Sequence, residues 1–119
     1  MQIAKAVAHY EPLVIAAKYP ERVREVLAES LNDDEMARVS IYECDNNDTW
    51  ARDHAFITLV STTDASASCR LLDFRFNGWG EKFAADKDNR INRTLYDKGV
   101  FSGERVDYDD FVLEGGSIE

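Results

Sequence analysis

The stretch Asn47–Asp53, which reads NDTWARD, places an indole, a guanidinium and two carboxylates between two strand-like runs. Asn and Asp suit a tight turn, whereas Trp and Arg are not needed for turning. A carboxylate beside an indole can receive a planar cation, because the cation gains hydrogen bonds at its edge and a π face beneath it. A solvated acidic loop with a half-buried Trp and a local Arg–Asp pair has the same sequence. The stretch alone leaves both interpretations open.

The composition limits the classes of ligand. At 119 residues the chain forms one domain at most, and 45% hydrophobic with 31% charged residues is ordinary for a soluble globular protein. The net charge of −9 argues against nucleic acid and anionic membrane as partners. It fits a cationic ligand and an acidic surface equally well. No apolar run is long enough to span a membrane, and Met1–Pro12 lacks the pattern of a signal peptide, so we expect a cytoplasmic protein.

The side chains that bind metals give no site. Cys44 and Cys69 form no metal or redox motif, and each lies in a strand-like run where a small buried residue is expected. His9 and His54 are isolated from other ligands, and Trp50 stands where a calcium loop needs glycine. His54 follows Asp53 directly, but neighbours on a strand point to opposite faces, so we expect His54 outside the site. No metal and no cofactor are predicted.

The elements that must position these residues follow from hydrophobic spacing. In the first half, the helical stretch Ile3–Ala8 is broken at Pro12, and the apolar run Leu13–Ala17 predicts a strand covered on both faces. A helix is expected to begin at Pro20, with an inward stripe that Asn32–Asp34 ends or interrupts. The predicted stripe consists of Val23, Val26, Leu27 and Leu31. The alternating run Val39–Cys44 predicts the next strand, and the NDTWARD stretch follows its end.

The second half adds three more strands and a helix. Phe56–Val60 and Cys69–Phe76 read as strands joined by a small polar hairpin turn, Ser61–Ser66. Asn77–Gly80 reads as a turn that carries a second indole. Asp86 could cap a helix through Lys98, with Ile91 and Leu95 inward and Gly99 as its stop. Tyr108–Leu113 predicts the last strand.

The order of these elements repeats. Strand, helix and strand over Leu13–Cys44 recur over Leu71–Leu113, and an acidic turn follows each copy. In an array of repeated units the equivalent turns converge, which would bring Asp53 and Glu114, both at predicted strand ends, to one central space. Two ordinary α/β units would also show this order by chance. Asp73 lies within a strand, where a paired or edge carboxylate is expected.

Three segments resemble motifs of the agmatine deiminase family, which is grouped with the Porphyromonas-type peptidylarginine deiminases. NDTWARD resembles the family's Asn/Asp-Asp-x-Trp-x-Arg-Asp signature. Asp73–Gly80, DFRFNGWG, resembles its Asp-aromatic-x-Phe-Asn-x-Trp-Gly element, and Phe111–Ile118, FVLEGGSI, resembles its Leu-Glu-Gly-Gly-Ser-Ile element. The resemblance covers the chain from about Glu11 onward, and three motifs in the right order are far more specific than one.

The resemblance implies an α/β (α+β) fold: a partial pentein, an α/β-propeller of which this chain would hold about two of five strand–helix–strand units. These units would lie at about 11–50 and 55–119 of a single domain, 1–119. The implied reaction is hydrolysis of a guanidinium group, in which a cysteine thiolate attacks, ammonia leaves and water releases the ureido product, with a His as acid and base.

The resemblance also implies residue roles. Asp53 would bind the guanidinium nitrogens bidentately, Glu114 would help to hold the His, and Trp50 would wall the pocket. Asn47 and Asp48 would complete the substrate-binding set. Arg52 is expected to be a structural ion-pair partner, because a cation aimed at a cationic substrate would repel it.

Two positions favour the agmatine branch over the peptidylarginine branch. The peptidylarginine branch carries Arg where this chain has Gly78, and it lacks the glutamate that stands here as Glu114. Agmatine, a small cation without a carboxylate, needs no clamp for one. A peptidylarginine deiminase remains the alternative within the family, and a non-catalytic guanidinium-binding or interaction module remains the alternative outside enzymes.

The sequence departs from the family in one respect. The family's His-x-Asp motif and nucleophilic Cys lie downstream of its third motif, and neither Cys44 nor Cys69 matches that cysteine. We therefore expect an excerpt of about a third of a full enzyme, inactive on its own. Two units of five would leave strand edges and apolar faces open, so we also expect homo-oligomers or marginal stability.

Overall fold

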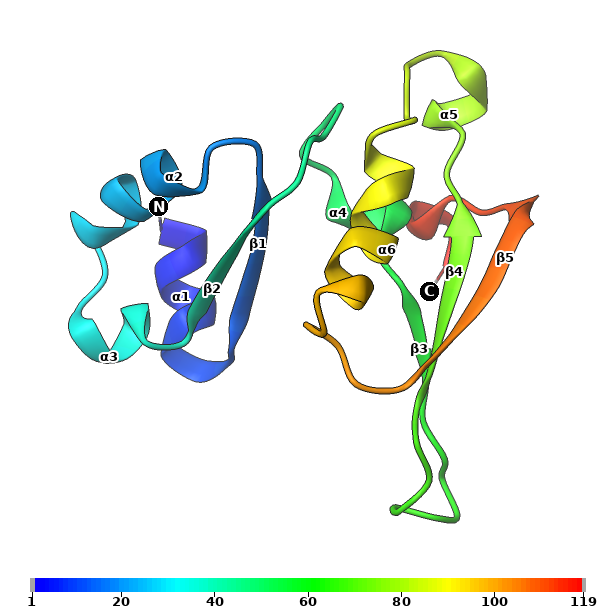
Figure 1. Ribbon diagram of the computed structural model, residues 1–119, viewed down its shortest axis with the longest axis horizontal. Helices are drawn as coiled ribbons and strands as arrows, with labels where there is room; N and C mark the ends of the chain where they lie inside the picture. The colour runs from blue at the N-terminus through cyan, green and yellow to red at the C-terminus, as the bar shows by residue number, and fades with distance from the viewer. Residues whose placement is uncertain (1, 119) are drawn as a thin grey trace. The chain divides into compact units, whose positions relative to one another are not determined.

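The computed structural model of the chain describes residues 2–118 and is a mixed α/β structure with two small sheets (Figure 1). The chain divides into two compact units, residues 1–45 and residues 46–119, and each is described by itself. Across the described residues, none of the helices has the length and apolar character that crossing a membrane requires.

Unit 1 is a parallel strand pair with its connecting helices. Its elements are α1 (Gln2–Tyr10), β1 (Leu13–Ala17), α2 (Pro20–Ala28), α3 (Asp33–Met36) and β2 (Val39–Glu43). β1 pairs with β2 in parallel, with Leu13 opposite Val39. Both strands and the helical start at Pro20 are as predicted. The core is formed by Ala8, Leu27, Leu31 and Val39.

Two details of unit 1 differ from the expected pattern or explain it. Val26 is 46% exposed, so its place in the inward stripe was wrong, whereas Leu27 and Leu31 lie in the core as predicted. The break after α2 has a clear cause. The side chain of Asn32 accepts a hydrogen bond from the Glu35 amide, and the Glu35 carboxylate accepts one from the Asn32 amide. This capping box starts a new helix, α3, at the stretch that the sequence predicted to end or interrupt the preceding helix.

Unit 2 is a three-stranded sheet with four short helical segments. Its elements are α4 (Ala51–His54), β3 (Ile57–Leu59), β4 (Arg70–Arg75), α5 (Gly78–Glu81), α6 (Asp88–Asp97), β5 (Glu104–Val112) and the 3-10 turn η1 (Gly115–Ser117). The strand order is β3-β4-β5. β3 and β4 are antiparallel, which confirms the predicted hairpin, and β4 and β5 are parallel. The β4–α6–β5 connection therefore repeats the strand–helix–strand order of unit 1, as predicted, and the two strands are parallel in each unit.

Three local structures in unit 2 differ from the sequence predictions. Asp53 lies on the one-turn helix α4 and not at a strand end. Asn77–Gly80 does turn, but the backbone from Gly78 to Glu81 has positive φ throughout, so the turn is left-handed. Helix α6 begins after Lys87 with no side-chain cap from that residue, so Asp86 is not its cap.

The sheet of unit 2 has an irregular, exposed edge strand. Phe74 lies opposite Tyr108, but the next β4 residue, Arg75, lies opposite Val112, so β5 bulges between these pairs. Phe111, within the bulge, is 62% exposed. β3 at the other edge is short, and Leu59 at its end is 50% exposed. Both sheet edges therefore present backbone groups and apolar side chains.

Candidate functional site

The helix α4 holds Asp53, the residue that the sequence singles out as the cation anchor. The Asp53 amide donates to the Trp50 carbonyl at 3.1 Å, and the Ala55 amide donates to the Ala51 carbonyl at 2.8 Å. The Asp53 side chain is partly buried. A helix of one turn cannot stabilise itself, because so few hydrogen bonds offset the cost of ordering its backbone. The position of Asp53 therefore depends on what packs against α4.

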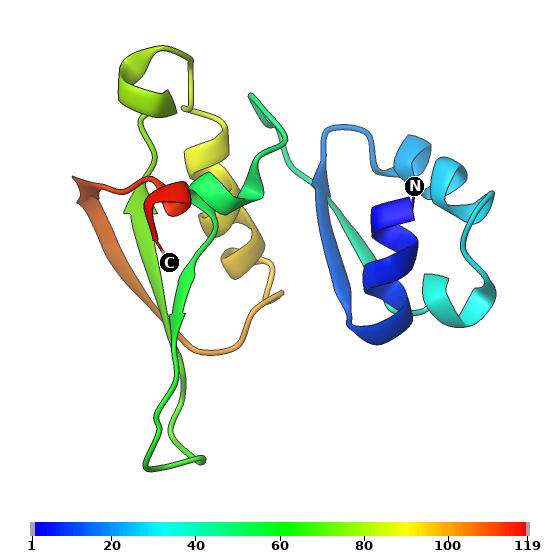
Figure 2. The same ribbon diagram turned by 180° about the vertical axis from the view of Figure 1, so that it is seen from behind.

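The turn η1 packs directly against α4 (Figure 2). Gly115 lies so close to α4 that a Cβ on it would stand 1.7 Å from the Arg52 carbonyl oxygen. A Cβ on Gly116 would lie 3.8 Å from Oδ1 of Asp53, which is ordinary contact. The first and third motifs therefore meet, as the sequence predicted, and a glycine is required where their backbones approach.

The Arg52 side chain stabilises the contact between α4 and η1. Its Nε donates to the Gly115 carbonyl at 3.1 Å, and its Nη2 donates to the Ile118 carbonyl at 2.8 Å. The expected structural role is thus found, but the observed acceptors are backbone carbonyls where the sequence suggested a carboxylate. The guanidinium is held against η1 by these two bonds, which ties the first motif to the third.

Glu114 immediately precedes η1 at the end of β5. It is partly buried, and its carbonyl accepts hydrogen bonds from the Ser117 amide at 2.9 Å and the Ser117 hydroxyl at 2.6 Å. These bonds fix the backbone on which the Glu114 carboxylate stands. Asp53 and Glu114 thus come from two segments in contact, each carboxylate partly buried. A shared contact of the two carboxylates with an organic cation stays a prediction.

Asn47 and Asp48 are committed to internal hydrogen bonds. Oδ1 of Asn47 accepts from the Lys87 amide at 2.7 Å and the Asp88 amide at 3.3 Å, which caps α6 from a distant loop. Oδ1 of Asp88 in turn accepts from the Asn47 amide at 2.7 Å and the Asp48 amide at 3.3 Å. Oδ1 of Asp48 accepts from the Thr49 amide at 2.6 Å. A substrate contact by Asn47 or Asp48 stays a prediction. In the structure, their hydrogen bonds stabilise the loop before α4 and the start of α6.

Trp50 stands directly before α4 and is 62% exposed. The alternative interpretation, a solvated acidic loop, predicted a half-buried Trp50, and the indole is more exposed than that. A wide indole surface one turn from Asp53 is compatible with a pocket wall, and that role stays a prediction.

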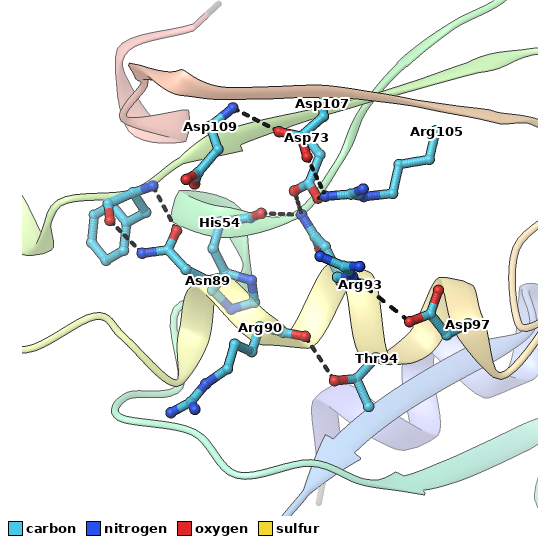
Figure 3. Close-up of polar contacts among 12 residues, drawn as sticks. His54, Asp73, Asn89, Arg90, Arg93, Thr94, Asp97, Arg105, Asp107 and Asp109 are labelled. Atoms are coloured by element: carbon cyan, nitrogen blue, oxygen red, sulfur yellow. Dashed lines mark hydrogen bonds and ion pairs between the residues drawn. The ribbon is translucent and has the colours of Figure 1, made fainter.

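A buried polar cluster adjoins the last residue of α4 and consists of Asn92, Asp73 and Arg105 (Figure 3). Nδ2 of Asn92, on α6, donates to the His54 carbonyl at 2.6 Å and to Oδ1 of Asp73 at 2.7 Å. Nε of Arg105 donates to Oδ2 of Asp73 at 2.7 Å, and Nη2 of Arg105 forms an ion pair with the same oxygen at 2.7 Å. Asp73 is therefore a paired carboxylate, as the strand position suggested. The cluster connects α4, β4, α6 and β5.

His54 is 8% exposed, and its Nδ1 is buried with no hydrogen-bond partner among the described residues. Burial lowers the pKa of His54 below 6.5, and the nearby carboxylates of Asp88, Asp53 and Asp73 oppose this shift. The imidazole is therefore neutral at pH 7. The sequence placed His54 on a strand facing away from Asp53. That premise was wrong, because both residues lie on α4.

The sequence interpretation missed Asp88 and Asn92, although a signal was present. Asp88, Asn92 and Leu95 recur at helical spacing, which places two polar residues on the stripe of a buried leucine. Asp88 is 2% exposed and Asn92 is 5% exposed. Buried polar side chains are almost always hydrogen-bonded, so such an interruption of an apolar stripe predicts a polar partner on a neighbouring element.

A groove of about 420 Å³ runs between α6 and the β4–β5 pair (Figure 3). Its charged lining includes Asp73, Arg93, Asp97, Arg105 and Asp107. None of the predicted site residues lines this groove. Within residues 2–118, the structure brings together no group of three or more side chains suited to holding a metal ion.

Known proteins match the whole length of the chain. The sequence model of the Porphyromonas-type peptidyl-arginine deiminases matches residues 1–119. A Listeria monocytogenes protein assigned as agmatine deiminase 1 is 32% identical over 99% of this chain and 31% of its own length. The chain thus spans about a third of such relatives.

Solved structures agree with the sequence matches. A Porphyromonas gingivalis protein assigned as an arginine deiminase superposes with a TM-score of 0.86 and 38% identity, over 99% of this chain and 33% of its own. An agmatine deiminase from C. jejuni with substrate bound has a TM-score of 0.76 and 31% identity, over 99% of this chain and 32% of its own. The fold of the chain is therefore that of part of these deiminases.

Proposed function

Because the chain belongs to the Porphyromonas-type peptidyl-arginine deiminase family, we propose that it forms the substrate-binding portion of an agmatine deiminase. The whole enzyme would hydrolyse the guanidinium of agmatine to N-carbamoylputrescine and ammonia, a step toward putrescine. A cysteine thiolate would attack the guanidino carbon, ammonia would leave, and water would release the product from the thioether-linked intermediate. Two parallel strand–helix–strand units in succession support a partial pentein.

The packing of α4 against η1 carries this proposal. It brings Asp53 next to the segment that follows Glu114. The two segments approach so closely at Gly115 that any side chain there would overlap the Arg52 carbonyl oxygen. Asp53 would accept hydrogen bonds from two nitrogens of the guanidinium, since a carboxylate and a guanidinium match in geometry and charge. Glu114 would add a second negative charge and orient the general acid–base group. Trp50 would offer its indole face to the flat cation.

Agmatine is favoured over a peptidylarginine substrate for a chemical reason. A substrate with a carboxylate needs a cation to bind that group, and this chain has Gly78 where the peptidylarginine branch has Arg. The Arg52 guanidinium is engaged by the carbonyls of Gly115 and Ile118. The negative charges of Asp53 and Glu114 suit a ligand that is cationic throughout.

Isothermal titration calorimetry of the 119-residue chain tests the proposal, with agmatine, putrescine and arginine as ligands. Agmatine is expected to bind more tightly than putrescine, which lacks the guanidinium, and than arginine, which carries a carboxylate. Asp53→Asn is expected to weaken agmatine binding at least about tenfold, because a hydrogen bond to a charged group contributes about 1.5–3 kcal/mol.

Asp64→Asn is the matched control, because it removes the same charge from the exposed loop between β3 and β4. It is expected to leave agmatine binding unchanged. Equal affinities of the wild type and Asp53→Asn would show that Asp53 is not the anchor. Equal affinities for agmatine and putrescine would contradict guanidinium recognition and leave only attraction to an acidic protein.

A further inference from the structure

Asn92 connects two elements of unit 2 through its side chain. It lies in the middle of α6, is 5% exposed, and uses one amide nitrogen for two hydrogen bonds to separate elements. One acceptor is the His54 carbonyl at 2.6 Å, and the other is Oδ1 of Asp73 at 2.7 Å. Both acceptors lack a proton to offer, so the side-chain amide must direct its nitrogen toward them.

The acceptor on β4 is itself fixed. Asp73 is 7% exposed, and its other oxygen, Oδ2, accepts a hydrogen bond from Nε of Arg105 on β5 at 2.7 Å and forms an ion pair with Nη2 of the same guanidinium at 2.7 Å. Arg105 also contacts Asp107 at 3.3 Å. A buried carboxylate that is paired with a guanidinium has little freedom, because leaving either group unpaired is costly. Asn92 therefore connects α4 to a rigid frame of three elements.

The acceptor on α4 is the carbonyl of its last residue, immediately after Asp53. α4 is a single turn, so outside contacts must hold it. Arg52 and η1 hold it on one side through the Gly115 and Ile118 carbonyls. Asn92 holds the other side through the His54 carbonyl. Between these two attachments stands Asp53.

We propose that Asn92 is a positioning residue that fixes the helix carrying Asp53, so that its hydrogen bond to the His54 carbonyl sets the affinity of the site for a guanidinium group. Asn92 does not touch the substrate and acts through the backbone of α4. The consequence for affinity rests on the function proposed above. The consequence for the order of α4 does not, and the experiment measures both.

The structure offers a matched control on the same helix. Asn89 is also a side-chain bridge: its Nδ2 donates to the carbonyls of Phe76 at 2.6 Å and Ala85 at 2.9 Å, and its Oδ1 accepts from the Phe76 amide at 2.8 Å. Asn89 thus ties α6 to the end of β4 but makes no such bond to α4. Asn92→Ala, Asn92→Asp and Asn89→Asp therefore separate loss of a bridge from loss of the α4 attachment.

The first measurement is amide hydrogen exchange by NMR on the 119-residue chain, read at Ala55, whose amide closes α4. In Asn92→Ala and Asn92→Asp the protection factor at Ala55 is expected to fall at least about tenfold relative to the global change, and in Asn89→Asp it is expected to follow the global change. Equal local losses in the Asn92 and Asn89 variants, or an unchanged Ala55 in Asn92→Ala, would overturn the proposal.

Acidification provides a readout that a purely structural role does not share. The carboxyl introduced by Asn92→Asp would face Asp73, and Arg105, His54 and Asp88 are further ionisable neighbours, with Asp88 one turn earlier on α6. Two carboxyls at this distance share a proton, which raises the pKa of one of them, and the proton restores a donor. Protection at Ala55 is expected to recover in Asn92→Asp between about pH 7 and pH 5 and not in Asn92→Ala. Equal pH profiles in both variants would count against the hydrogen bond.

The second measurement is agmatine titration of the same variants. The dissociation constant is expected to rise about tenfold or more in both Asn92 variants and to change less than about twofold in Asn89→Asp. If the wild-type chain binds no agmatine, the proposed function fails while hydrogen exchange still decides the positioning role. If agmatine binds normally to an Asn92 variant that has lost protection at Ala55, the link from α4 order to affinity is refuted. Where Asn92→Asp does not fold, Asn92→Ala decides both measurements.

Discussion

Asp53 and His54 are neighbours on one turn of helix, and their surroundings give them opposite roles. Asp53 is partly exposed, whereas the His54 imidazole is buried and its Nδ1 has no hydrogen-bond partner within residues 2–118. Burial lowers the pKa of the imidazole, so the residue beside the proposed anchor stays neutral at pH 7. A cation next to Asp53 is thereby avoided under the conditions in which a guanidinium would bind.

This difference predicts a pH dependence of the stability of unit 2. The pKa of His54 is lower in the folded state than its ordinary value of 6.5, so the unfolded state binds the proton first as the pH falls. The free energy of unfolding is therefore expected to be level above about pH 7.5 and to decrease as the pH falls through 6.5 toward the lower folded pKa. Urea denaturation between pH 7.5 and 5.5, followed by tryptophan fluorescence, measures it, because Trp50 and Trp79 both lie in unit 2.

His54→Gln is expected to reduce this pH dependence. His9→Gln serves as the control, because His9 is exposed and belongs to unit 1. It should leave the fluorescence transition of unit 2 unchanged. A slope that survives in His54→Gln would assign the effect to the carboxylates of unit 2.

At the scale of residues, the sequence predicted that the segments of Asp53 and Glu114 meet but not what supports them. Asp53 and the Glu114 segment were expected to meet, because their motifs recur at equivalent places in a repeat. Asn47 was interpreted as a ligand-binding residue, yet its side chain caps a helix about forty residues away in the sequence. Such a cap satisfies the same donors as a local one, but no local pattern identifies it.

At the scale of elements, the contact between α4 and η1 is the closest in the proposed site, and it makes a sharp prediction. Gly115→Ala would place a Cβ 1.7 Å from the Arg52 carbonyl oxygen, so one of the two segments must move. We expect unit 2 to lose about 1–3 kcal/mol or more of stability, as overpacking generally costs. The urea midpoint by tryptophan fluorescence measures the loss.

Gly116→Ala is the neighbouring control. Its Cβ would meet only Oδ1 of Asp53 at 3.8 Å, so the stability change should stay within about 0.5 kcal/mol. Similar losses in the two variants would mean that η1 is sensitive to any side chain and that the backbone approach is not the cause.

The elements themselves were predictable where hydrophobic spacing is regular. The bounds of β1 were predicted correctly, and the β3–β4 hairpin and the centre of α6 at Ile91 and Leu95 were also confirmed. α4 was not predicted, because four residues are too few for a helical period and its stability comes from η1 and α6. The start of α6 was misplaced at Asp86, because its capping group is supplied by Asn47.

At the scale of the whole molecule, the chain spans about a third of the length of its relatives. The positions of its cysteine and histidine side chains predict whether it can hydrolyse a guanidinium group by itself. The deiminase reaction needs a thiolate and an acid–base His at the guanidinium. Cys69 precedes β4, whereas Glu114 follows β5. Because these strands are parallel, the two residues lie at opposite ends of the pair. His54 is buried, and its carbonyl is held by Asn92.

We therefore expect the 119-residue chain to bind agmatine without hydrolysing it. Ammonia release in a coupled assay should equal that of the enzyme-free blank, for the wild type and for Cys69→Ser alike. Release above the blank that Cys69→Ser abolishes would contradict this prediction and make Cys69 a nucleophile.

Homo-oligomerisation, a cytoplasmic location and the remaining units of the propeller stay predictions. The exposed Phe111 and Leu59 at the two sheet edges are the places where association would begin.

The left-handed turn from Gly78 to Glu81 has a consequence for the handedness of the residues it can hold. Trp79 and Glu81 have φ of 58° and 66°, each an L-residue in a conformation that costs about 1–2 kcal/mol. The indole of Trp79 recovers part of that cost by edge contacts with Phe76 and Phe83. For a D-amino acid the same backbone is the relaxed form. Gly80 is exposed and has φ of 78°. A D-amino acid introduced there by chemical synthesis would therefore suit the backbone better than the corresponding L-amino acid.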